Sequence, residues 1–100
     1  MFDSIIEIAV AHGAELVILF GSRAKGTERD QSDIDICIVA DTSAKRRLAA
    51  AISAEIELEL PVDILVYTPT EWKTCIEDET SFANKILKEG TILYGQPQIS

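Results

Sequence analysis

The sequence predicts a small α/β (α+β) domain in which helices pack on one mixed sheet. The sequence contains three apolar runs of strand length and several segments whose apolar residues recur at helical spacing. A helical segment separates the second and third runs, and such a crossover normally joins parallel strands. The 100 residues suffice for one compact domain, which we expect to span residues 1–95 before a flexible tail at 96–100.

The first part of the chain predicts a helix and then two buried strands. Apolar residues at helical spacing predict a helix over residues 2–12, with Asp3 or Ser4 as its N-cap. Continuous apolar runs predict strands at 16–20 and 33–39. A long loop connects these two strands, and loops of that length are often functional.

The middle of the chain predicts a second helix and a third strand. We expect the helix to begin at Thr42 or Ser43 and to end at Pro61, because proline lacks the amide that a helix interior needs. The apolar run at 62–67 predicts the third strand, which the helical crossover should place parallel to the second.

The last third predicts two short helices and an edge strand. Residues 68–71 read Thr-Pro-Thr-Glu, which is the pattern of a capping box with proline at the first helical position. Trp72 follows, either as a partner contact or as a residue at the edge of the core. A final helix is expected at 81–89, and residues 91–94 would add a short extended edge.

Charge and composition limit the function. The 17 acidic and 9 basic residues give a net charge of −8, which argues against an extended nucleic-acid surface. No apolar run approaches the roughly 20 residues of a membrane span, and no signal peptide is visible. Cys37 and Cys75 lie far apart in the sequence, so we expect free thiols and a cytoplasmic protein.

Three aspartates are the first candidate functional residues. Asp33 and Asp35 alternate along the second strand and therefore point to the same face. Asp63 interrupts the apolar run near the start of the third strand, so parallel pairing would bring all three carboxylates to one end of the sheet. Clustered carboxylates repel one another unless a cation neutralises them, and such oxygen ligands suit Mg²⁺ or Mn²⁺. A solvated strand start is the alternative interpretation.

The loop after the first strand is the second candidate. Gly21 would let a phosphate approach the backbone closely, and Ser22 could cap a short helical turn whose free amides face an anion. Arg23 and Lys25 make this loop locally basic in an acidic chain. We expect these two side chains either to make secondary phosphate contacts or to lie in solvent.

Together these motifs resemble a known family. Residues 20–26 (FGSRAKG), then 32–35 (SDID), with a third aspartate at Asp63, are similar to the nucleotidyltransferase superfamily that includes DNA polymerase beta. Within it the chain looks like the minimal nucleotidyltransferase (MNT) subgroup, the antitoxin partners of HEPN toxins. The resemblance extends through residues 85–94 and so covers almost the whole chain.

The resemblance implies roles for these residues. Asp33 and Asp35 would bind two Mg²⁺ ions and the triphosphate of ATP. Asp63 would complete the site of one ion and act as base toward the acceptor hydroxyl. Gly21 and Ser22 would hold the β- and γ-phosphates.

Three functions remain open for such a chain. The first is transfer of AMP from ATP to a hydroxyl of a partner protein, namely AMPylation of a HEPN-type toxin by its antitoxin. The second is the same chemistry on a small molecule such as an aminoglycoside. The third is a non-catalytic module that neutralises a toxin by binding it.

Overall fold

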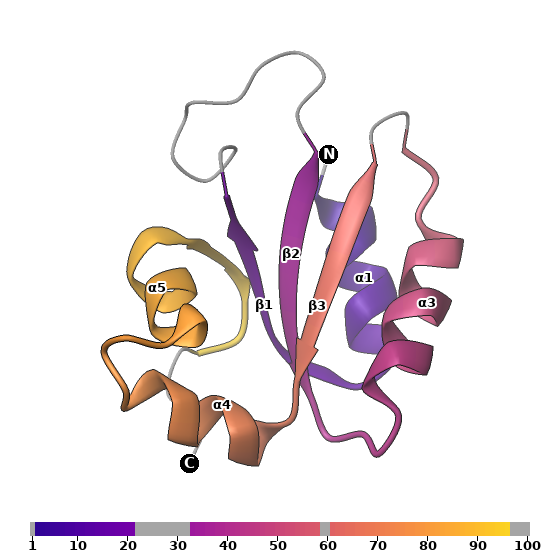
Figure 1. Ribbon diagram of the computed structural model, residues 1–100. Coiled ribbons are helices and arrows are strands. Elements are labelled where there is room, and N and C mark those ends of the chain that lie inside the picture. Colours follow the sequence, from indigo (N-terminus) through magenta and orange to yellow (C-terminus); the bar gives the residue numbers. More distant parts are fainter. Residues whose placement is uncertain (1, 22–32, 59–60, 97–100) are drawn as a thin grey trace.

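Helices and strands follow one another in the order that the sequence predicts, within the residues 2–21, 33–58 and 61–96 that the computed structural model describes (Figure 1). The strands are β1 (Ala14–Phe20), β2 (Ile34–Ala40), β3 (Val62–Tyr67) and β4 (Thr91–Tyr94). The helices are α1 (Asp3–Ala11), α3 (Lys45–Glu55), α4 (Pro69–Ile76) and α5 (Phe82–Glu89). None of these helices is long and apolar enough to cross a membrane. All but one residue of the predicted tail lies outside the described ranges.

The strands form one mixed sheet in the order β3-β2-β1-β4. β2 and β3 pair in parallel, so the prediction from the helical crossover is confirmed. β1 runs antiparallel to both β2 and β4. At the start of β2 the amide of Ile34 donates a hydrogen bond of 2.9 Å to the carbonyl of Pro61. This bond fixes the register at the sheet end where the aspartates were expected to meet.

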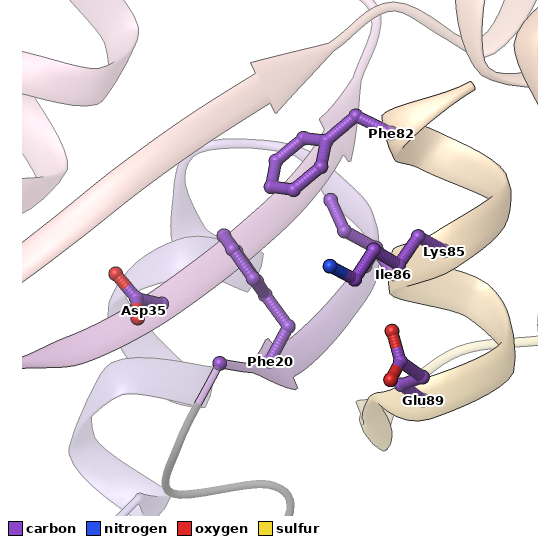
Figure 2. A pocket seen from close by; sticks show the side chains of 7 residues that line it. Phe20, Asp35, Phe82, Lys85, Ile86 and Glu89 are labelled. Carbon is purple, nitrogen blue, oxygen red and sulfur yellow. The ribbon is translucent and has the colours of Figure 1, made fainter. Parts of the chain in front are cut away.

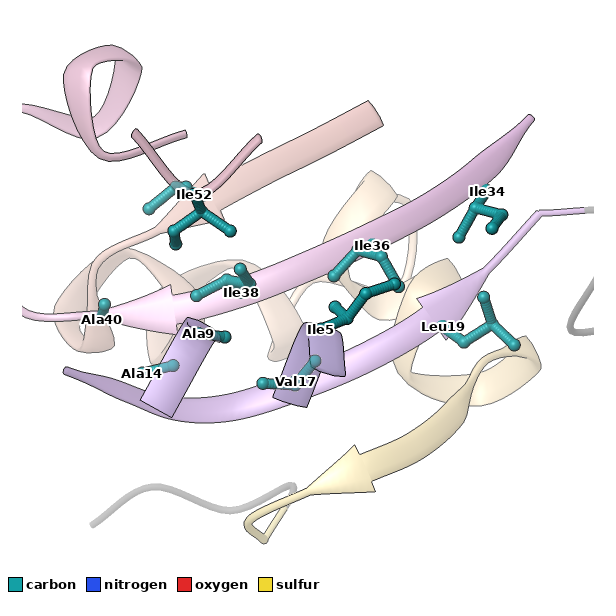
Figure 3. Packing of buried hydrophobic residues seen from close by; sticks show 11 residues of the cluster. Ile5, Ala9, Ala14, Val17, Leu19, Ile34, Ile36, Ile38, Ala40 and Ile52 are labelled. Carbon is teal, nitrogen blue, oxygen red and sulfur yellow. The ribbon is translucent and has the colours of Figure 1, made fainter. Parts of the chain in front are cut away.

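Helices cover both faces of the sheet, and the two buried clusters differ in composition. α1 and α3 lie on one face, where Ile34, Ile36 and Ile38 of β2 pack among aliphatic residues (Figure 3). α4 and α5 cover the opposite face, where Cys37 and Val39 of β2 are buried. The alternation along β2 therefore divides its side chains between two cores, as a period of two requires.

Two helices, α1 and α3, have boundaries that differ from the prediction. α1 has Phe2 at its N-cap without a side-chain cap bond, so the expected cap by Asp3 or Ser4 is wrong. Asp3 instead lies in the first turn, where a carboxylate interacts favourably with the helix dipole. The free thiols predicted for the two cysteines are confirmed.

α3 is shorter at both ends than the sequence suggested. The hydroxyl of Thr42 accepts a hydrogen bond from the amide of Ala44 in a turn that precedes the helix, so the helix does not begin at Thr42 or Ser43. The helix ends at Glu55 and not at Pro61, because the chain becomes extended at Ile56. An extended chain covers about twice the distance per residue of a helix, which suits the return to the sheet.

The turns around α4 and α5 hold these helices against the sheet. The predicted capping box is confirmed, since Thr68 and Glu71 exchange side-chain and backbone hydrogen bonds of 3.2 and 3.0 Å. Trp72 is fully buried in the core, which excludes the partner-contact interpretation. The side chain of Asn84, buried in α5, donates to the carbonyl of Ile76 in α4 at 2.7 Å, so α5 has a fixed position.

Candidate active site

Two of the three candidate aspartates face each other across neighbouring strands. Asp35 on β2 is the register partner of Asp63 on β3, near the start of both strands. Asp33 immediately precedes β2, one residue outside the strand in which it was expected. Asp33 and Asp63 are exposed, whereas Asp35 is half-buried. Parallel pairing thus brings Asp35 and Asp63 together at one end of the sheet, as the sequence predicts, with Asp33 at the residue that precedes β2.

Burial and like charge both act on the carboxyl of Asp35. Partial burial raises the pKa of its carboxyl, and the neighbouring charges of Asp63 and Asp33 raise this pKa further. Desolvation and like charge both oppose the ionised form. A site with this arrangement is stabilised when a cation enters it.

Gly21, at the end of β1, lies against the same carboxylate. Its neighbour Phe20 is the register partner of Asp35 across the antiparallel pair. Gly21 has a φ of +79°, a conformation that side chains strongly disfavour. A Cβ at this position would overlap the Asp35 Oδ2 and lie 3.2 Å from its Cγ. The site therefore requires glycine here both for backbone conformation and for space.

The other residues of the predicted phosphate loop, Ser22, Arg23 and Lys25, lie outside the described ranges. Their roles toward phosphate stay predictions. What is described is the position of Gly21, which sets the start of this loop beside Asp35.

The donor set fits a hard divalent cation that is completed by its substrate. Among residues 2–21, 33–58 and 61–96, no three Asp, Glu, His or Cys side chains form a group that could hold a metal ion. Mg²⁺ is usually bound by one or two carboxylates and keeps water and substrate phosphate as its other ligands. Asp35 and Asp63 are the two paired carboxylates that would hold such an ion.

A cavity of about 340 Å³ opens beside the aspartates (Figure 2). Gly21 and Asp35 form part of its wall. The rest is contributed by Phe20 of β1 and by one face of α5, with the residues Phe82, Lys85, Ile86 and Glu89. The carboxylate of Asp35 thus borders a hollow that can receive a ligand.

Sequence reasoning did not identify the α5 side of this cavity. The sequence predicts a helix over residues 81–89 and a family resemblance over residues 85–94, and neither prediction assigns a role to the side chains that line the cavity. A signal was present, because Lys85 and Glu89 share the helical spacing of Phe82 and Ile86 and so interrupt an otherwise apolar face.

A family model described as polymerase beta, nucleotidyltransferase matches residues 3–99. No curated protein matches the chain. Three solved structures are similar over most of its length. A toxin–antitoxin with AMP-PNP shares 24% identity, with a TM-score of 0.60, covering 94% of this chain and 73% of that one. A mutant of the toxin–antitoxin MntA-HpeT shares 22%, with a TM-score of 0.61, covering 96% and 74%.

The third structure is a tri-AMPylated HEPN toxin of Shewanella oneidensis in complex with MNT antitoxin. It shares 21% identity, with a TM-score of 0.53, covering 94% of this chain and 69% of that one. At these identities the structures establish the common fold. The family model matches nearly the whole chain, so the chain belongs to the polymerase beta-type nucleotidyltransferases.

Proposed function

We propose that the chain transfers AMP from ATP to a hydroxyl of a partner protein and acts as the antitoxin of a HEPN-type toxin. One observation carries the proposal: Asp35 is paired with Asp63 across β2 and β3, and Gly21, which has no side chain, lies against Asp35. This arrangement provides carboxylates for a divalent ion and room for phosphate at the same point. Nucleotidyltransferases of this family typically use a divalent metal and a nucleoside triphosphate.

The residues would divide the work as follows. Asp35 and Asp63, with Asp33 next to them, would hold two Mg²⁺ ions, which supply charge neutralisation at the transferred phosphate. Gly21 leaves the phosphates room to approach the backbone, and Ser22 would donate to them. Asp63 is exposed on β3 and is the proposed base that takes the proton of the acceptor hydroxyl.

The acceptor is proposed from two similar structures. One is a toxin–antitoxin with AMP-PNP, and another is an AMPylated HEPN toxin in complex with MNT antitoxin. The residues that line the cavity and the strand ends are those proposed here to hold the nucleotide, so the acceptor hydroxyl is proposed to come from a partner protein.

The test is transfer of label from α-labelled ATP, in Mg²⁺, to a HEPN-type toxin supplied as the acceptor. The Asp33→Asn/Asp35→Asn variant should lose transfer by at least about 100-fold, because metal-held charge stabilises the transition state by several kcal/mol. Asp41→Asn is the matched control. Asp41 is exposed just beyond the other end of β2, so its removal should leave transfer unchanged.

Two other outcomes correspond to the other functions. Label that appears on an aminoglycoside and not on the partner would replace the protein acceptor by a small molecule. Protection of cells by the double aspartate variant, equal to that by the wild type, would favour a binding module and contradict the catalytic proposal.

A further inference from the structure

The cavity beside Asp35 has an aromatic wall that the proposed phosphate chemistry does not use. Phe20 and Phe82 approach edge to face with ring centroids 5.7 Å apart. Phe82 is 52% exposed and Ile86 below it is 2% exposed. An exposed ring above a buried aliphatic side chain leaves an apolar surface that a ligand can cover.

The cavity is continuous with the aspartate site. Gly21 and Asp35 belong to both, so a ligand in the cavity would touch the place proposed for the phosphates. A volume of about 340 Å³ is at the lower end of the range for ligand pockets, roughly 300–1,000 Å³. It suits a flat ring system better than a whole nucleoside triphosphate.

The polar group on the wall also suits a heterocycle. Figure 2 shows the Lys85 side chain reaching into the same space as the Phe20 and Phe82 rings. A lysine ammonium donates hydrogen bonds, and every nucleobase offers acceptor atoms on its ring edge. The Asn84 side chain joins α5, which carries Phe82 and Lys85, to α4 through a hydrogen bond of 2.7 Å to the carbonyl of Ile76.

We infer that this cavity binds the base of the nucleotide, which stacks on Phe82 and accepts a hydrogen bond from Lys85. The inference rests on the proposed nucleotidyltransferase function and adds where the base lies and which side chain holds it. With the base there, the phosphates extend past Phe20 to Gly21 and Asp35.

The experiment compares two probes in the presence of Mg²⁺: a non-hydrolysable ATP analogue, and inorganic tripolyphosphate, which has no base. Phe82→Ala should weaken the ATP analogue by roughly 5- to 150-fold, the range for loss of one base–aromatic stack. The same variant should bind tripolyphosphate like the wild type. Phe82→Tyr keeps the ring and should retain the affinity for the ATP analogue.

Tyr94→Ala is the matched control, since Tyr94 is another exposed ring, 40% exposed on β4, and does not line the cavity. It should change neither affinity. Equal binding of the ATP analogue by wild type and Phe82→Ala would overturn the base site while the proposed function stands. Equal weakening of both probes would also overturn it, because the effect would not concern the base. Failure of the wild type to bind either probe would overturn the proposed function as well.

Discussion

The two faces of β2 differ in what they bury, although one strand supplies both. On the face toward α1 and α3, Ile34, Ile36 and Ile38 are all fully buried in an aliphatic core. On the opposite face, Asp35 lies at an open end and Cys37 is closed over by helices two residues further on. The face toward α1 and α3 is buried along its whole length. The opposite face changes from the candidate site at Asp35 to buried core at Cys37, two residues further along the strand.

The comparison shows how a short chain obtains both a core and a site. Successive side chains of a strand point to opposite faces of the sheet, so one residue can pack in the core while its neighbour belongs to the candidate site. The aliphatic face can be optimised for packing, and the carboxylate at the end of the other face can remain electrostatically unfavourable. The following predictions test whether these two faces are as separate as the structure indicates.

The largest expected effect is the difference in reactivity between the two thiols. Burial raises the pKa of the Cys37 thiol to about 12 and closes it to solvent, whereas Cys75 is only half-buried. Alkylation of Cys37 requires unfolding, so it should be slowed at least about 1,000-fold for a domain stable by 5 kcal/mol or more. Iodoacetamide labelling at pH 8, followed by peptide mass spectrometry, measures both rates.

The same labelling in concentrated urea is the control, because there both thiols should react alike. Comparable rates in the folded protein would mean that the closed part of this face opens readily. The boundary drawn between Cys37 and Asp35 would then be wrong.

The next effect concerns the aliphatic face. Ile36→Ala removes a fully buried side chain that packs between Leu19 and Ile64, and it should lower the free energy of unfolding by about 2–5 kcal/mol. Urea unfolding followed by circular dichroism measures the loss. Ile92→Ala, at a position 40% exposed on β4, is the control and should cost less than half as much. Equal losses would show that the core is not concentrated on this face.

A smaller effect is expected from alanine substitutions at two glycines. Their comparison distinguishes backbone strain, which both substitutions introduce, from disturbance of Asp35, which only one introduces. Gly13 and Gly21 both have positive φ, +91° and +79°, so alanine at either should cost roughly 1–2 kcal/mol of stability. Only Gly21 faces Asp35, whereas a Cβ at Gly13 meets no atom within 4 Å.

Gly21→Ala should therefore also reduce AMP transfer by about 10- to 100-fold, because the Asp35 carboxylate must move. Gly13→Ala should leave transfer intact in the same assay at a temperature where both variants are folded. Equal transfer by the two variants would refute the close coupling of Gly21 to the site.

The sequence predicts the parallel pairing of β2 and β3 and, through it, the meeting of Asp35 with Asp63. Both depend on strong signals, namely apolar runs and a helical crossover. The start of α1 and both ends of α3 were predicted wrongly, because turns such as that at Thr42 compete with helix at small cost in free energy. Helix ends depend on such local balances more than on periodicity.

The cavity could not be predicted, because it joins segments that are distant in sequence. Phe20 ends β1 and Phe82 begins α5, and only the antiparallel addition of β4 and the packing of α4 bring the two rings together. Spacing along the chain carries no information about such a contact. The aspartates were easier, since one parallel pair was sufficient to place them.

The smallest expected effect is a gain in stability. It comes from a substitution on the face of β2 that carries Asp35, whereas Ile36→Ala on the other face lowers stability. Asp35→Asn removes a half-buried charge that Asp63 and Asp33 repel, so without metal it should stabilise the protein by about 0.5 kcal/mol after solvent screening. This corresponds to a melting temperature higher by roughly 2–4 °C. Asp41→Asn makes the same charge change at an exposed position away from the carboxylates and should leave the melting temperature unchanged.

Mg²⁺ with a non-hydrolysable ATP analogue should reverse the order, because ligand binding stabilises only a protein that can hold it. The wild type and Asp41→Asn should then melt at a higher temperature than Asp35→Asn. Ile36→Ala, one residue away on the other face, should lose stability with or without ligand. If Asp35→Asn is less stable than the wild type in the absence of metal, Asp35 contributes to the stability of the fold. The separation of the two faces of β2 into a buried core and a functional site would then be wrong at Asp35.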